Sequence, residues 1–433
     1  MEKDVAIIGG GIAGTHAAIE LADLGRKVVI IERKPSIGGK AAQLGKFFPT
    51  DDCALCFSVC NSMFKSRGFR KCLYRSNLEL NPNIEILPLA NITEIKGSAG
   101  DFTIEVKQKP RYVNRNCIGC LACIEACPIE VPNEFNFGWN TRKAIYLPFS
   151  MAVPHLAVIN RAECRDCNEE CKAACPTSAI DLNAQEQDLS IKAKAIVVAT
   201  GFEEMDPTNL KEYGYGTYKN VITQIQLARM LDPTGPSKGM PIIPSSGEPA
   251  KSVTIALCVG SRDARVKEYC SRICCTYSLK HALMLRDKGV DVRICYMDIR
   301  SFGEYENYYV RAREEGVTFI RGRIAGIEED PETKKLLMNV ENTITSQYIE
   351  MEDELVVLTA ALIPAEGAEK IAEFLTLKTD ENGFFMGDIA KFSQTETELS
   401  GIYIAGTAEG PKDIPDSIVQ ANAAAVKINH SLK

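Results

Sequence analysis

The sequence predicts an α/β protein of two nucleotide-binding-type domains, with a cysteine-rich domain inserted into the first. Three observations lead to this fold class. A glycine-rich turn joins the apolar run 4–8 to a helical pattern, and two dense cysteine runs lie between residues 110 and 187. Further apolar strands and a long helical stretch follow between residues 251 and 364. Strands that alternate with helices in this way form sheets covered by helices.

The composition describes an ordinary acidic protein. A chain of 433 residues has room for two or three domains, and its net charge of −7 comes without a basic stripe for nucleic acid. The N-terminus enters an apolar strand directly, without the basic region, apolar segment and cleavage site of a secretory signal. The longest apolar stretch, 144–159, contains two prolines and is too short to span a bilayer. We therefore expect a cytoplasmic protein whose only membrane contact is through partners.

The first element is a strand at residues 4–8, followed by Gly9, Gly11 and Gly14, a helix, and a second strand at 28–31 that ends at Glu32. A Gly-x-Gly-x-x-Gly motif alone is a weak signal. Between a strand and a helix, with an acidic residue closing the next strand, it is a strong dinucleotide signature. The glycines let a pyrophosphate approach the helix N-terminus, and Glu32 can accept from ribose hydroxyls.

Sixteen of the seventeen cysteines fall into four sets of four. A cytosolic setting argues against disulfides, and the four histidines do not cluster with cysteines as a zinc site requires. Cys295, the remaining cysteine, lies in an apolar run and is expected in the core. The first set is Cys53, Cys56, Cys60 and Cys72. We expect an iron–sulfur cluster there; the alternative is a redox-active dithiol of Cys53 and Cys56.

Two further sets form a ferredoxin-like insert. Cys117-x2-Cys120-x2-Cys123-x3-Cys127-Pro matches the bacterial ferredoxin run, and Cys164-x2-Cys167-x3-Cys171-x3-Cys175-Pro has one additional residue. The fourth cysteine of each run ligates the other cluster. We therefore predict one [4Fe–4S] cluster on Cys117, Cys120, Cys123 and Cys175, and a second on Cys164, Cys167, Cys171 and Cys127.

The fourth set lies where a second nucleotide would be expected. Strands are predicted at 193–200, 253–257, 290–296, 317–320 and 355–358, with a linker at 233–249. The strand ending at Cys258 runs into the stretch 266–286, which is long enough for a helix carrying Cys270, Cys274 and Cys275. The turn between them has only Gly260 in place of a second glycine fingerprint. We predict that these four thiols bind an iron–sulfur cluster at the position where a second nucleotide would otherwise bind.

This region carries a family resemblance. Cys-Val-Gly-Ser-Arg-Asp at 258–263 and Tyr-Cys-Ser-Arg-Ile-Cys-Cys-Thr-Tyr-Ser-Leu-Lys at 269–280 resemble the flavin-binding A subunit (HdrA) of heterodisulfide reductases. The resemblance implies that the four cysteines bind a cluster close to FAD and that Lys280 contacts the flavin. Other stretches resemble FAD-binding segments of two-dinucleotide flavoproteins; their residues are Arg33, Gly38, Gly39, Lys40, Thr200, Gly201, Gly406, Thr407 and Ser417. Many relatives have Asp where Thr407 stands.

The resemblance implies a two-dinucleotide-binding-domain flavoprotein, thioredoxin-reductase-like, with an inserted ferredoxin-like 2[4Fe–4S] domain. The FAD-binding domain is expected in three parts, 1–109, 188–250 with a linker, and 365–433. The insert occupies 110–187, and the cluster-bearing second domain 251–364. By the resemblance, the helix that begins near residue 416 directs its N-terminus at the flavin.

The cofactors predicted are one FAD and four [4Fe–4S] clusters. A flavin accepts electron pairs whereas a cluster passes single electrons, so together they split or merge pairs. The resemblance implies electron bifurcation or confurcation in an anaerobic complex, with ferredoxin or a hydrogenase- or dehydrogenase-type donor or acceptor. The other subunits of a heterodisulfide-reductase-like complex would be partners, and homodimerisation within that complex is compatible with it.

Two other functions stay open at the level of sequence. One is a self-contained NAD(P)H-dependent flavin oxidoreductase of glutamate synthase small-subunit or thioredoxin-reductase type, against which the missing second glycine fingerprint counts. The other is a non-catalytic scaffold subunit whose clusters only order loops.

Overall fold

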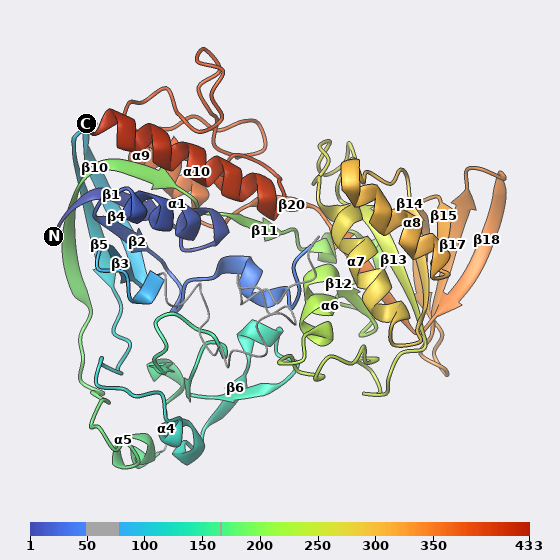
Figure 1. Ribbon diagram of the computed structural model, residues 1–433. Coiled ribbons are helices and arrows are strands. Elements are labelled where there is room, and N and C mark those ends of the chain that lie inside the picture. Colours follow the sequence, from blue (N-terminus) through green and yellow to red (C-terminus); the bar gives the residue numbers. More distant parts are fainter. Residues whose placement is uncertain (49–77, 165–166) are drawn as a thin grey trace, which may run out of the picture.

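The computed structural model describes residues 1–48, 78–164 and 167–433. The first cysteine set therefore lies outside the described residues; it consists of Cys53, Cys56, Cys60 and Cys72. The structure tests neither the cluster nor the dithiol interpretation of this set. Figure 1 shows two sheets side by side, with a third, irregular part below the first. The N- and C-termini both lie on the side of the first domain that faces away from the second sheet.

The first sheet has seven strands in the order β3-β2-β1-β10-β5-β4, with β21 paired to the end of β10. Its parallel strands are β1 (Glu2–Ile8), β2 (Val28–Ile31), β3 (Ile84–Leu87), β10 (Gln187–Val198) and β21 (Ile402–Ile404). The antiparallel strands are β4 (Ala90–Ser98) and β5 (Asp101–Gln108). A turn divides the stretch between residues 84 and 98 into β3 and β4.

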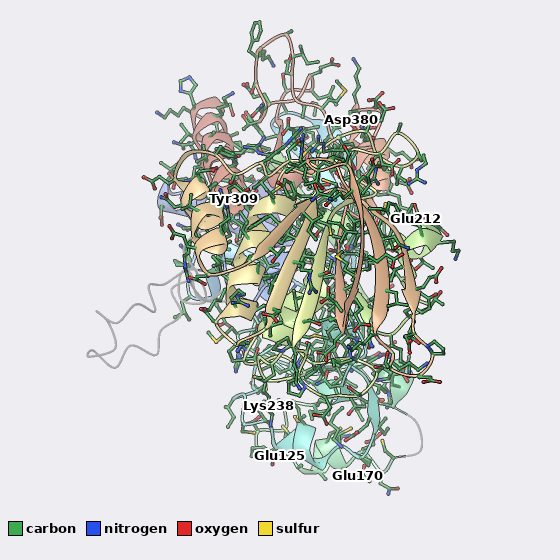
Figure 2. All side chains as sticks on the ribbon, turned by 90° about the vertical axis from the view of Figure 1, so that its right-hand side faces the viewer. Glu125, Glu170, Glu212, Lys238, Tyr309 and Asp380 are labelled. Atoms are coloured by element: carbon green, nitrogen blue, oxygen red, sulfur yellow. The ribbon has the colours of Figure 1, made fainter. Side chains whose placement is uncertain are left out.

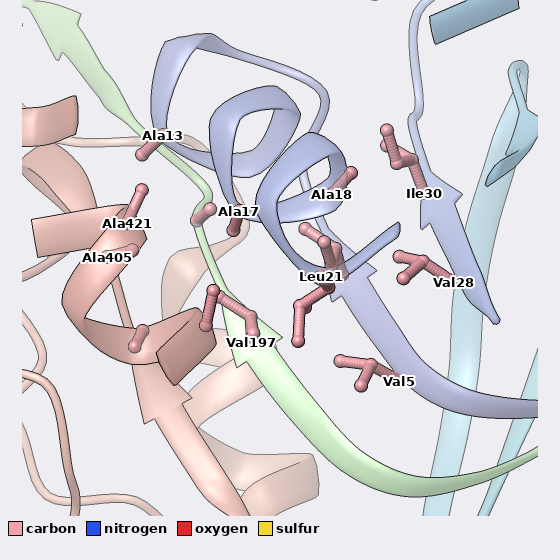
Figure 3. Close-up of a cluster of buried hydrophobic side chains, with 14 of the residues drawn as sticks. Val5, Ala13, Ala17, Ala18, Leu21, Val28, Ile30, Val197, Ala405 and Ala421 are labelled. Atoms are coloured by element: carbon pink, nitrogen blue, oxygen red, sulfur yellow. The ribbon is translucent and has the colours of Figure 1, made fainter. Parts of the chain in front are cut away.

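Both faces of the parallel part of this sheet are buried, because its strands are continuously apolar and successive side chains point to opposite faces. Val5 and Ile7 face one core, which Ala17 and Leu21 of α1 (Ile12–Asp23) cover (Figure 3). The helix α10 (Ile414–Ser431) packs beside α1 on this face. Ala6 and Ile8 face a second core together with α9 (Ala368–Leu375). Parallel strands buried on both faces account for the continuous apolar runs in the sequence.

The second domain contains an all-parallel five-stranded sheet in the order β12-β19-β13-β14-β15. These strands are β12 (Val221–Thr223), β13 (Ser252–Val259), β14 (Asp291–Tyr296), β15 (Thr318–Arg321) and β19 (Leu355–Ala360). One face carries α6 (Gln224–Leu231), α7 (Cys274–Arg286) and α8 (Glu306–Glu314). The other carries an antiparallel sheet of β16 (Ile324–Glu329), β17 (Leu336–Asn342) and β18 (Gln347–Asp353).

Two short antiparallel strands, β11 (Phe202–Glu204) and β20 (Leu362–Pro364), run between the domains (Figure 1). They carry the chain out of the first domain and back into it. The segment 188–250 is thereby divided: β10 belongs to the first sheet, whereas β12 and α6 belong to the second. The boundary expected at residue 250 is wrong in this respect, because the β12 strand pairs with β19.

The insert is built from short elements: α4 (Ala122–Ala126), α5 (Glu170–Ala173), and the strand pairs β6 (Glu130–Pro132) with β7 (Thr141–Lys143) and β8 (Ile145–Tyr146) with β9 (Val158–Ile159). In Figure 2, which faces the second domain, Glu125 and Glu170 mark it at the bottom. It is tied to both domains. Ser36 and Val153 exchange hydrogen bonds, and Arg229 of α6 donates to Asn136 at 2.9 Å.

Within the described ranges, no helix combines the length and apolar character that crossing a membrane requires.

Candidate functional site

A cavity of about 220 Å³ lies between the two domains. Its first wall comes from the β1–α1 turn, the end of β2, the chain after β10 and the start of α10. Its second wall comes from β11, the first turn of α6 and one face of α7. Eleven of the residues expected to contact FAD line it: Gly9, Gly11, Glu32, Arg33, Gly39, Lys40, Thr200, Gly201, Lys280, Thr407 and Ser417. The structure therefore brings together residues from both ends of the sequence.

Gly14, Gly38 and Gly406 do not line the cavity but shape its wall. A Cβ on Gly14 would lie 2.0 Å from the carbonyl oxygen of Gly9. A Cβ on Gly406, whose φ is +73°, would lie 2.6 Å from Ala13 Cβ. The β1–α1 turn and the chain that follows β21 can approach α1 this closely only where they carry no side chain.

Glu32 holds the β1–α1 turn in place. Its carboxylate accepts from the backbone N–H of Gly10 at 2.9 Å and from that of Lys34 at 2.8 Å. Burial raises the pKa of Glu32 and the two N–H donors oppose this. The carboxylate is thus both an anchor for the turn and an acceptor at the cavity wall, the position in which an adenosine ribose is bound in this type of fold.

Glu203 of β11 compensates the charge of two basic residues at the cavity. Lys40 and Arg33 both contact Glu203 of β11, and Arg33 also pairs with Glu366. These ion pairs join the segment after β2 to the interdomain strands. Beside them, Thr200 Oγ1 is buried without a hydrogen-bond partner in the described chain.

The N-terminus of α10 faces the cavity through Asp413, Ile414 and Ser417. Asp413 is the N-cap, accepting from the Asp416 N–H at 2.9 Å, and Ser417 Oγ donates to the Asp413 carbonyl oxygen. Lys412, which the sequence interpretation missed, is buried and donates to Glu409 at 2.6 Å and to Gly406 at 2.9 Å. Burial lowers the pKa of Lys412. A helix N-terminus with a lysine beside it favours a negative charge in the cavity.

The second wall is one face of α7 with the residue before it. Ile273, Thr276, Tyr277, Lys280 and His281 all line the cavity, at the spacing of successive helical turns. Lys280 is 2% exposed, and its Nζ donates to the Lys46 carbonyl oxygen at 2.7 Å. Lys280 thus reaches across from the second domain to the first.

The expected thiols converge at the start of this helix, with one correction. The α7 helix begins at Cys274, so Cys270 lies in the loop before it and not on the helix. The loop contains Arg262 and Arg272 in left-handed conformation, and Arg272 excludes a continuous helix from residue 266. Cys258 itself has a φ of +60° at an irregularity of β13. Such strain in a residue other than glycine concentrates at functional sites.

The four thiols influence one another. Burial raises the pKa of Cys258 to about 11, and Cys275 and Cys270 contribute to this increase. Burial, Cys258 and Cys275 raise the pKa of Cys274 well above its ordinary value. Adjacent buried thiols resist ionisation unless a cation compensates their charge, which is the donor chemistry of an iron–thiolate site. The N-terminus of α7 also favours the ionised state.

The insert groups its thiols in the crossed pattern that the sequence predicts. Cys117, Cys120, Cys123 and Cys175 line one small cavity. Cys171 interacts with Cys127, Cys164 and Cys167, the other expected set. In the parts of the chain that are described, no three His, Cys, Asp or Glu side chains are arranged to hold a single metal ion. Cluster ligation by these residues stays a prediction. Cys295 is 2% exposed, in the core as expected.

Glu204 of β11 is a second residue that sequence analysis missed. It lines the cavity, and burial raises its pKa to about 7, which the Thr223 hydroxyl and Lys40 partly oppose. Only the fold places β11 against the cavity, so no local signal distinguished this glutamate from other exposed-looking acids.

The residues present fit a flavin dinucleotide. A glycine turn at a helix N-terminus suits a pyrophosphate, an acidic residue follows at the second strand, and the buried Thr200 Oγ1 lacks a partner in the described chain. These features belong to this chain and do not depend on any resemblance.

Comparisons with known proteins agree with this geometry. Residues 4–55 match the family model of FAD dependent oxidoreductases. The chain is 46% identical over 99% of its length to the iron–sulfur A subunit of the CoB–CoM heterodisulfide reductase of Methanocaldococcus jannaschii. It is 46% identical over 98% of its length to the A subunit of the H2/formate:CoB–CoM heterodisulfide,ferredoxin reductase of Methanococcus maripaludis. It spans just under two thirds of these relatives, 64% and 63% of their lengths.

Among solved structures, T. acidophilum thioredoxin reductase matches with a TM-score of 0.53 and 16% identity, over 100% of this chain and 99% of that one. At this identity the likeness concerns the fold alone, and it confirms the predicted thioredoxin-reductase-like α/β class. The predicted resemblance is confirmed as well: over nearly its whole length, the chain is a homologue of the A subunits of heterodisulfide reductases, which are oxidoreductase subunits.

Proposed function

We propose that this chain is an FAD and iron–sulfur electron-transfer subunit of a larger, cytoplasmic oxidoreductase complex. One FAD occupies the interdomain cavity, and a [4Fe–4S] cluster is ligated by Cys258, Cys270, Cys274 and Cys275 at its edge. The insert holds two further clusters on the crossed cysteine sets. Cys53, Cys56, Cys60 and Cys72 hold a fourth.

One observation carries this proposal. The helix α7 begins with Cys274 and Cys275 and presents Thr276, Tyr277 and Lys280, only a turn further on, to the cavity that the β1–α1 glycine turn also lines. A cofactor in the cavity and a cluster on these thiols therefore share one helical segment. Neighbours this close exchange electrons without an intervening carrier.

Under this proposal the residues of the chain bind and orient the FAD. The glycine turn and the α1 N-terminus bind the pyrophosphate, and Glu32 accepts from the ribose hydroxyls. The α10 N-terminus and Lys412 stabilise negative charge at the opposite end. Bound FAD supplies conversion between electron pairs and single electrons. Under this proposal Lys280, a donor from the second domain that lines the cavity, holds a proton at the flavin.

The relatives' names suggest the place of this chain in an assembly. They mention a CoB–CoM heterodisulfide, ferredoxin, H2 and formate, all for proteins of greater length than this chain. By homology, we assign to this chain the partners of such a complex: a catalytic subunit with a ferredoxin-type donor or acceptor. Bifurcation or confurcation at the FAD is the finer form of the proposal.

Anoxic purification followed by flavin, iron and sulfide analysis tests the proposal. We expect one FAD and about sixteen iron atoms per chain, the content of four cubanes. Redox titration monitored by visible and EPR spectroscopy then resolves the clusters. A preparation with FAD but no iron, whose flavin NADH or NADPH bleaches rapidly, would overturn the proposal in favour of a self-contained pyridine-nucleotide oxidoreductase.

A further inference from the structure

His281 is a buried polar residue of the cavity for which the glycine turn, the thiols and Lys280 provide no role. It is 2% exposed and lies on the cavity face of α7. Its Nε2 has no hydrogen-bond partner in the part of the chain that the structure describes. A buried polar atom without a partner is uncommon in native proteins and costs free energy, so it points to a bound molecule.

With the Gln224 amide oriented as it is in the structure, the hydrogen-bond network assigns the ring proton of His281 to Nδ1. Nδ1 lies 2.6 Å from Gln224 Oε1, and Gln224 Nε2 lies 3.0 Å from Ser278 Oγ and 3.3 Å from Thr359 Oγ1. The amide nitrogen thus faces two hydroxyl oxygens that accept its hydrogens. The amide oxygen can only accept, so Nδ1 of His281 donates to it.

The ring is neutral, which fixes the character of Nε2. Burial lowers the pKa of His281 well below its ordinary value, and the charge of Lys280 acts in the same direction. A neutral imidazole with its hydrogen on Nδ1 has a bare lone pair on Nε2. Nε2 of His281 is therefore a hydrogen-bond acceptor at the cavity, and the hydrogen bond to Gln224 holds the ring in one orientation.

The partner must be an N–H or O–H donor on the side of the cavity formed by the second domain. Glu32 and the glycine turn occupy the first-domain side, where the adenosine half and pyrophosphate bind under the proposed function. The α7 face is left for the isoalloxazine ring. An isoalloxazine has one ring N–H in every redox state, at N3, whereas N5 carries hydrogen only after reduction. Among the ring N–H groups, N3–H is therefore the one that can satisfy the acceptor in every redox state.

We infer that His281, locked by Gln224 as the Nδ1–H tautomer, is a flavin-positioning residue whose Nε2 accepts from the N3–H of the bound isoalloxazine. This inference rests on the proposed function. It assigns to His281 no proton or electron transfer, because the hydrogen bond is present before and after reduction. Its role is to fix the ring's orientation relative to Lys280 and to the thiols at the start of α7.

A double-difference binding experiment tests the inference. Flavin-depleted protein, with its clusters retained, is titrated with FAD and with FAD methylated at N3, and quenching of flavin fluorescence gives Kd. We expect wild type to bind the methylated analogue about tenfold more weakly, the loss of one hydrogen bond. His281→Phe should weaken FAD binding by a similar factor and bind the two flavins equally.

His281→Gln is the matched control. Both variants leave Gln224 Oε1 without its donor, but glutamine restores an acceptor near the Nε2 position, so it should keep the preference for FAD. The wild-type comparison needs no variant, and it decides the matter even where His281→Phe fails to fold. Equal binding of both flavins by wild type overturns the role of His281 alone, whereas no binding of FAD overturns the proposed function.

Discussion

Glu204 shows how one residue gains a property from its surroundings. On an exposed strand a glutamate has a pKa near 4.5, but at the interdomain cavity burial raises the pKa of Glu204 to about 7. Lys40 and the Thr223 hydroxyl lower the pKa again, without cancelling the effect of burial. The residue is therefore protonated in part at neutral pH.

The stability of the protein should depend on pH through Glu204. Between about pH 4.5 and 7 the folded chain keeps a proton that the unfolded chain has released, so Glu204 makes stability fall as pH rises through this window. Glu204→Gln removes this dependence. We expect the stability gained by the variant over wild type to grow from pH 4 to pH 8, by at most about 3 kcal/mol. Urea unfolding across this range measures it, and a difference that does not change with pH would contradict the assignment.

Gly14, the last glycine of the motif, is a second residue whose surroundings determine its role. A Cβ there would meet the Gly9 carbonyl oxygen at 2.0 Å. Gly14→Ala should therefore push the turn away from α1, with a cost of roughly 1–3 kcal/mol and a loss of bound FAD. The flavin content of the purified variant and its unfolding midpoint report both effects. Gly326→Ala, where the added Cβ meets nothing within 4 Å, is the control that should retain full flavin content.

At the scale of elements, α6 joins the second domain to the insert through a buried ion pair. Arg229 Nη1 lies 2.7 Å from Asp232 Oδ2, with the two side chains 2% and 6% exposed. Arg229 also donates to Asn136 of the insert and lies over the ring of Phe135. The helix thus carries a buried charge that Asp232 compensates.

Removal of one partner of this pair should be strongly destabilising. Asp232→Ala leaves the guanidinium of Arg229 buried without its counter-charge, and we expect a loss of about 3–5 kcal/mol in the free energy of unfolding. The exposed pair of Lys335 and Glu352 is the comparison, since Lys335→Ala should cost less than about 1 kcal/mol. Equal effects of the two substitutions in chemical denaturation would show that the pair at α6 contributes no more than a surface contact.

The sequence predicts elements well where a pattern is local. The strand at 28–31 has the bounds expected, the glycine turn joins a strand to a helix, and the insert thiols are grouped in the crossed pattern. The prediction that Cys270 lies on a helix is wrong because apolar spacing does not reveal the left-handed residue Arg272. The alternation of Leu336, Met338 and Val340 is the local signal for β17, which the predicted strands do not include.

The remainder of the site depends on tertiary structure. Nothing near Glu204 or Lys412 in the sequence indicates burial, and β11 acquires its position only by pairing with β20. His281 stands next to Lys280, yet its significance lies in a hydrogen-bond partner that is missing from the described chain. A sequence pattern cannot show that a buried atom lacks a hydrogen-bond partner.

For the whole molecule, the arrangement of domains is the basis of the function. The first domain supplies a nucleotide site, the second has four thiols in the position of a nucleotide site, and the insert adds eight more. The interdomain strands β11 and β20 hold the first two so that one cavity lies between them. The central claim is that a flavin and an iron–sulfur cluster meet at the start of α7.

The most direct test of this claim is the iron and flavin content of Cys274→Ser, purified without oxygen beside wild type. The account predicts a loss of about four iron atoms per chain, with FAD retained and one EPR signal missing from the reduced protein. An iron content and a set of EPR signals equal to those of wild type would contradict it.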